Sequence, residues 1–97
     1  MNLIDAVVNN DIEMVRQLLE EGADPNMCVD DTELRPLHFA AQNNYLELGK
    51  LLIAAGANIH VMTIPDGETP LDIAQLHENR EFVKLLLAHQ SGGENIN

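Results

Sequence analysis

Residues 36–57, PLHFAAQNNYLELGKLLIAAGA, decide the fold, because much of this segment recurs at a fixed distance on either side. The upstream copy, shifted by 34 residues, matches it at Leu3, Ala6, Asn9, Asn10, Glu13, Leu18, Gly22 and Ala23. The downstream copy, shifted by the same distance, matches it at Pro70, Leu71, Ala74, Glu81, Lys84, Leu85, Leu86 and Ala88. Chance gives about one or two identities in such windows, so the chain consists of units that stack on one another.

Each unit is predicted to contain two short helices. Pro36 and Pro70 suit the first position of a helix, where the missing N–H costs nothing. Apolar residues at i, i+3 and i+4 then mark one buried face on each second helix. Gly22 and Gly56 follow second helices, where a residue with positive φ ends the helix. The expected helices span residues 2–9, 11–21, 36–43, 46–55, 70–77 and 80–89.

Two hexapeptides resemble the T-P-L-H-x-A signature of the ankyrin repeat family: Arg35-Pro36-Leu37-His38-Phe39-Ala40 and Thr69-Pro70-Leu71-Asp72-Ile73-Ala74. Asp66-Gly67-Glu68-Thr69 looks like the entry from a hairpin into a repeat of this family. The resemblance covers about residues 1–90. It implies an all-α ankyrin-repeat solenoid of three stacked helix-turn-helix units, with short β-hairpin fingers projecting from the helices.

A single domain is therefore expected over residues 1–90. Its units are about 1–26, 27–60 and 61–90, and residues 91–97 form a polar C-terminal tail. The first unit lacks a hairpin, as suits an N-terminal cap. In the second unit Thr32-Glu33-Leu34-Arg35 replaces the family's entry sequence, so the first finger is expected to depart from the usual turn.

Composition narrows the classes of partner. The 97 residues include 5 Lys and Arg and 16 Asp and Glu, a formal charge of −11. Nucleic acid and anionic membranes require a basic surface, so we expect neither, and a charge-steered partner is expected to be a basic protein. No apolar run approaches the ~20 residues of a membrane span, and the lone Cys28 suits a reducing compartment. The expected location is the cytoplasm or the nucleus, and the expected state is a monomer.

Catalytic and metal-binding chemistry is poorly represented. His38 occupies the signature position at which the family uses the ring to hydrogen-bond backbone, which implies a structural role. Cys28 has the acidic neighbours Asp30, Asp31 and Glu33, which make it a poor nucleophile. Neither metal-ligand spacing nor a Gly-rich phosphate loop is present. We therefore expect no enzyme activity, no metal and no cofactor.

A protein-binding surface is what the resemblance implies instead. Ankyrin proteins commonly bind partners through the finger tips and the concave, solvent side of the first helices. Carried over to this chain, these positions hold Val8, Asn9, Asp30, Leu34, Gln42, Asn43, Ile64, Glu68, Leu76 and His77. Four of them are apolar where solvent is expected, which is typical of a binding site when such residues are contiguous.

Two functions remain. The first is a non-enzymatic protein-protein interaction module. The second is an acidic inhibitor or immunity protein that masks a basic enzyme or toxin. Residues 1–33 favour the second, because nine acidic residues stand against Arg16 alone, and such a field speeds association with a basic protein. The alternative explanation of the acidity is solubility.

Two substitutions are expected to stabilise the fold. Gly49 lies within a predicted helix, where Gly costs about 1 kcal/mol relative to Ala. Arg35 stands where the family has a capping Thr, and a cap is worth about 0.5–2 kcal/mol. Gly49→Ala and Arg35→Thr are therefore both predicted to raise the melting temperature.

Overall fold

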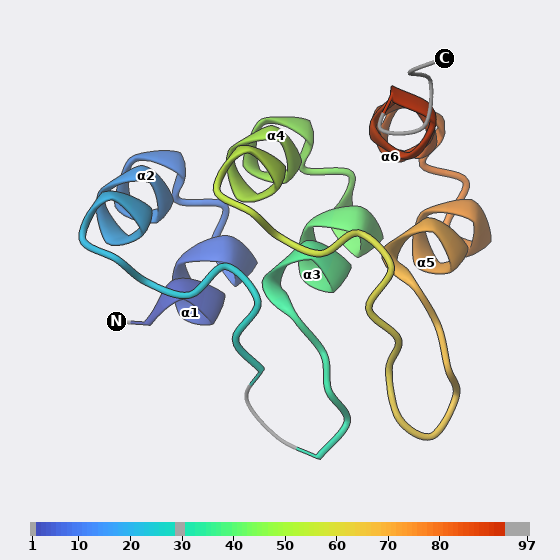
Figure 1. Ribbon diagram of the computed structural model, residues 1–97, viewed down its shortest axis with the longest axis horizontal. Coiled ribbons are helices and arrows are strands. Elements are labelled where there is room, and N and C mark those ends of the chain that lie inside the picture. The colour runs from blue at the N-terminus through green and yellow to red at the C-terminus, as the bar shows by residue number, and fades with distance from the viewer. Residues whose placement is uncertain (1, 29–30, 93–97) are drawn as a thin grey trace.

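The computed structural model describes residues 2–28 and 31–92, and every regular element in these ranges is a helix. The helices are α1 (Leu3–Val8), α2 (Ile12–Glu20), α3 (Pro36–Asn43), α4 (Leu46–Ala54), α5 (Pro70–Leu76) and α6 (Arg80–Gly92). They form two rows, with α1, α3 and α5 in an inner row and α2, α4 and α6 in an outer row (Figure 1). Two long loops, the fingers, descend from the inner row. The three stacked helix pairs predicted from the repeat are confirmed.

Polar side chains fix where several helices begin. The Asn2 side chain accepts a hydrogen bond from the Asp5 amide at 2.9 Å at the start of α1. At the start of α5, the Thr69 hydroxyl accepts from the Asp72 amide and the Asp72 carboxylate accepts from the Thr69 amide, both at 3.1 Å. This reciprocal capping box satisfies two amides that the helix leaves open. The predicted start of α5 at Pro70 is thereby explained.

The turn between the two helices of each unit has the same backbone conformation throughout. Asn10, Asn44 and Glu78, each 34 residues from the next, have φ values of 55°, 56° and 59°. The amide after each turn bonds back to a buried alanine of the inner helix, as Tyr45 does to the Ala40 carbonyl at 2.9 Å. Left-handed backbone suits Asn better than Glu, so the third turn carries a mild strain.

The core is aliphatic and runs through all three units. Three alanines at equivalent positions, Ala6, Ala40 and Ala74, are fully buried, which lets neighbouring inner helices approach closely. Around them lie leucines and valines of both rows, with Phe82 as the largest fully buried side chain. This aliphatic core accords with a sequence that has no Trp, one Tyr and two Phe.

Gly49 is buried in the contact between α4 and α6, which the sequence did not indicate. A Cβ atom at this position would lie 2.7 Å from Cε2 and Cζ of the Phe82 ring and 3.0 Å from the Leu85 side chain. Phe82 is fully buried and Leu85 is partly buried against the core, so a methyl group at Gly49 would have to displace packed side chains. The close approach at Gly49 therefore argues against the rise in melting temperature predicted from the sequence for Gly49→Ala.

The last helix is longer than predicted. Residues 22 and 56 are glycines with φ of 98° and 103°, and each ends its outer helix. The equivalent position in the third unit is Gln90, which does not favour a positive φ. α6 therefore continues to Gly92, and the first two residues of the expected tail are helical. Residues 93–97 lie outside the described part of the chain.

The fingers, residues 27–35 and 61–69, are loops in which the described residues contain no β-strand. The second finger nevertheless closes like a hairpin, because the Thr63 amide bonds to the Glu68 carbonyl at 3.0 Å. The Gly67 amide also bonds to the Thr63 carbonyl at 2.8 Å. In the first finger Glu33 has a φ of 62°, and residues 29–30 lie outside the described ranges. The expected fingers are present, but without regular strands.

Glu78→Asn is predicted to stabilise the protein by about 0.5–1 kcal/mol, because Asn tolerates the left-handed backbone that Glu78 adopts. Thermal unfolding measures the effect. The control is Glu47→Asn, an exposed position within α4, which should lose stability because Asn is a weaker helix former than Glu. A lower melting temperature for Glu78→Asn would contradict the strain assigned to this turn.

Gly49→Ala is now predicted to lower stability by about 1–3 kcal/mol, because overpacking against Phe82 exceeds the gain in helix propensity. Denaturant unfolding measures the loss. A second substitution provides the control: Phe82→Leu removes the ring atoms that the new methyl group meets. The double variant should therefore lose less stability than the two single losses added together. Additive losses would show that the Gly49–Phe82 contact is not the cause.

Candidate protein-binding surface

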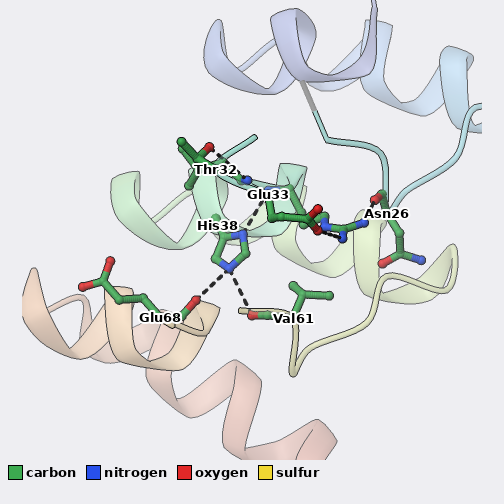
Figure 2. A network of polar contacts seen from close by, with 8 residues as sticks. Asn26, Thr32, Glu33, His38, Val61 and Glu68 are labelled. Atoms are coloured by element: carbon green, nitrogen blue, oxygen red, sulfur yellow. Dashed lines mark hydrogen bonds and ion pairs between the residues drawn. The ribbon is translucent and has the colours of Figure 1, made fainter. Parts of the chain in front are cut away.

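The second finger is attached to α3 through a single buried imidazole. Figure 2 shows the His38 ring between the first helix of unit two and the finger that precedes α5. Its Nδ1 atom accepts a hydrogen bond from the Arg35 amide at 2.9 Å. Since Nδ1 accepts, Nε2 carries the proton and donates to the carbonyls of Val61 and Glu68, both at 3.1 Å. Both ends of the finger are thereby held by one side chain.

This arrangement requires a neutral ring. Burial lowers the pKa of His38 below its ordinary value of 6.5, because the charged imidazolium would lose its hydration. Protonation at Nδ1 would also place two donors against each other, since the Arg35 amide already points at that atom. The structural role expected for His38 is the one that its contacts show.

Arg35 holds the base of the first finger. Its guanidinium donates to the Asn26 carbonyl and forms an ion pair with Glu33 (Figure 2). Threonine at this position would gain a helix cap but lose both contacts, and a hydrogen bond to a charged group is worth about 1.5–3 kcal/mol. The expected stabilisation by Arg35→Thr is therefore offset.

Six of the predicted binding residues form one row. Val8 and Asn9, Gln42 and Asn43, and Leu76 and His77 all lie at the C-terminal ends of the inner helices, and all are exposed. The three inner helices pack side by side, which aligns these ends. Apolar side chains stand at the two ends of the row and polar ones in the middle. Leu76 has 68% of its surface exposed.

The remaining predicted residues belong to the fingers. Ile64 has 53% of its surface exposed, whereas Glu68 and Leu34 are half-buried and therefore less accessible. Asp30 lies outside the described residues. Since α3 has 8 residues, the fingers and the row are separated by about 12 Å of helix. The ten predicted positions thus form two groups, and Leu34 is less accessible than the sequence suggested.

Sequence reasoning missed Met62, which is 59% exposed. The next residue, Thr63, is buried, and its hydroxyl accepts a hydrogen bond from the Glu68 amide at 3.1 Å. Met62 and Ile64 are therefore the exposed neighbours of a buried residue in the second finger.

Side chains that could hold a metal ion, or helices that could cross a membrane, would point to other functions. Within residues 2–28 and 31–92, no three His, Cys, Asp or Glu side chains lie close enough to hold a metal ion, and no helix is long and apolar enough to cross a bilayer. Two open hollows of about 370 Å³ are present, and one of them is lined by Gln75 and Glu78, which flank the row residues Leu76 and His77. This hollow is also lined by α6 residues such as Val83 and Lys84, and the other by α2 and α4 residues such as Arg16 and Leu51.

The burial of His38 predicts a pH-dependent stability. The unfolded chain binds a proton at this residue near pH 6.5, whereas the folded chain binds it only at lower pH. Between these values the unfolded state holds more protons, so the free energy of unfolding falls as the pH is lowered from about 7.5 to about 5.5.

Denaturant unfolding across this range checks the prediction. His38→Gln removes the titrating group and should flatten the slope. His77→Gln, which removes an exposed imidazole, should keep the slope of the parent protein. Equal slopes for all three proteins would show that His38 is not the source.

Comparison with known proteins places these features in a family. A family model described as ankyrin repeats, in three copies, matches residues 3–97. The chain is 42% identical over 73 residues to the 2-5A-dependent ribonuclease of Mus musculus, covering 75% of this chain and 10% of that protein. It is 40% identical over 91 residues to the potassium channel KOR1 of Oryza sativa subsp. japonica, covering 94% of this chain and 10% of the channel.

A third relative is the human ankyrin repeat domain-containing protein 49, 39% identical over 62 residues, or 64% of this chain and 26% of that protein. The chain thus spans about a tenth of the length of the ribonuclease and of the channel. What these relatives share with it is the repeat itself. Since the family model covers almost the whole sequence, and the structure has the three helix pairs that it describes, the chain belongs to the ankyrin repeat family.

Proposed function

We propose that this chain is a non-enzymatic module that binds a protein partner through the row at the inner helices and through the fingers. Ankyrin repeats in general suggest protein-protein interaction. The observation that carries the proposal here is the exposure of Leu76 in that row, accompanied by Val8 at its other end. Val8 and Leu76 stand at opposite ends of the row and do not form one contiguous apolar patch, so they support the proposal as two separate anchors for a partner that spans the row.

The same proposal accounts for the rest of the molecule. His38 is committed to holding the finger, and Cys28 is an exposed free cysteine. A binding module needs no cofactor or metal. A free thiol and an acidic surface suit a monomeric protein of the cytoplasm or nucleus.

Val8→Arg and Leu76→Arg are predicted to abolish recovery of the strongest co-purifying protein, because an apolar anchor is worth ~2 kcal/mol or more to an interface. Both side chains are exposed, so the melting temperature should stay within a few degrees. The matched control is Leu87→Arg on α6, an exposed leucine outside the row, which should keep the partner. We choose these positions over Leu34, whose half-buried side chain would confuse binding with folding.

Retention of the same partner by both row variants, with folding intact, would contradict binding at this surface.

A second function remains open to test: inhibition of a basic enzyme or toxin by the acidic first unit. It is supported by the surplus of acidic residues in residues 1–33, where Arg16 already pairs with Glu13 at 2.8 Å. An inhibitor of this kind should associate with its target much more slowly as salt increases. Modest salt dependence favours the general interaction module.

A further inference from the structure

The second finger displays two large apolar side chains that are separated by one residue in the sequence. Met62 and Ile64 are both more than half exposed, and the residue between them, Thr63, turns inward. In the described chain, the other large exposed apolar residues, Val8, Leu76 and Leu87, lie on helices. Met62 and Ile64 are therefore the only such pair within one loop of the described ranges.

The apolar pair is held in place before any partner arrives. The Ile64 amide donates to the Thr32 carbonyl of the first finger at 2.7 Å, which joins the two fingers. Thr63 closes the loop through its amide and hydroxyl, and His38 ties both finger ends to α3. A preorganised loop loses little conformational entropy on binding, so its exposed side chains contribute more of their contact energy.

Charge is distributed unequally between the two sides of the stack. The inner helices and fingers, within the described ranges, carry Asp5, Asp31, Glu33, Asp66, Glu68 and Asp72. Their only Lys or Arg is Arg35, whose guanidinium is occupied by Glu33 and the Asn26 carbonyl. The other four basic residues, Arg16, Lys50, Arg80 and Lys84, are all on outer helices. A partner that approaches the fingers therefore meets a negative surface.

Exposed apolar side chains within a negatively charged surface favour one class of partner, a basic protein segment that carries an apolar residue. Met62 and Ile64 offer exposed apolar surface to an apolar side chain, and flanking Lys or Arg residues complement the carboxylates of Asp66, Glu68 and Asp31. A second copy of this chain carries the same charge of −11 and is repelled. Nucleic acid and anionic lipid are repelled for the same reason.

We propose, resting on the proposed function, that the second finger binds a basic protein segment that inserts an apolar side chain against Met62 and Ile64. The acidic residues of the fingers orient and accelerate the encounter, and the apolar pair supplies most of the affinity. The finger thus recognises the segment, while the row at the inner helices provides the remaining contact.

A random-peptide display library, selected on the intact immobilised chain, tests this proposal. The enriched peptides are expected to combine a surplus of Lys and Arg with one or two large apolar residues. A synthetic copy of the most enriched peptide should bind Met62→Ser and Ile64→Ser at least about tenfold more weakly. It should bind Asp66→Asn several-fold more weakly, and its affinity should fall between about 0.02 and about 0.15 M salt.

Matched controls use exposed residues of the outer helices. Leu87→Ser removes an exposed apolar side chain and Glu47→Gln removes an exposed carboxylate, and neither should change the affinity. Enrichment of acidic or uncharged peptides, or binding indifferent to Met62→Ser and Ile64→Ser, overturns the proposal. If the selected peptides are lost only with Val8→Arg and Leu76→Arg, the binding function stands and the finger's role fails. If no peptide is enriched, the finger's role fails, and the binding function is decided by the recovery of the co-purifying protein with Val8→Arg and Leu76→Arg.

Discussion

Burial of aliphatic surface between successive units is the interaction on which the whole structure depends. Contacts run along each row of helices, from α1 to α3 to α5 and from α2 to α4 to α6, as well as within each pair. A single pair of short helices cannot bury enough apolar surface to compensate for its lost conformational entropy. Each unit is therefore stable only as a neighbour of another. Fingers, turns and binding residues all take their positions from this stack.

Polar contacts then give the stack its register. The Asn26 side chain accepts a hydrogen bond from the Asn58 amide at 2.7 Å and donates one to the Gly56 carbonyl at 3.2 Å. These bonds join the segment after α2 to the segment after α4. Asn79 donates to the carbonyls of Ala41 and Gln42 at 2.7 and 3.0 Å, joining the second unit to the third. Such bonds satisfy backbone carbonyls that the short helices leave open. They also fix one relative position where aliphatic packing alone tolerates several.

Periodicity was enough to predict what recurs, and it failed where the units differ. The helix starts at Pro36 and Pro70 follow from properties of the chain within one unit, and both were predicted correctly. The role of Gly49 depends on Phe82, a residue of the next unit, which no local pattern connects to it. For the binding positions, family resemblance located the exposed row, yet the accessibility of Leu34 and Met62 depends on how each finger folds back.

The pairing of Gly49 with Phe82 also bears on how arrays of this kind grow by duplication. In the third unit the position of Gly49 is held by Val83, which has a branched side chain where Gly49 has none and which lines the open hollow beside α5 and α6. A copied third unit placed behind the original would set its own phenylalanine against that valine. Neighbouring surfaces must therefore change together after a duplication. The units share one sequence pattern, but the contact between α4 and α6 uses a Gly–Phe pair that the other units do not repeat.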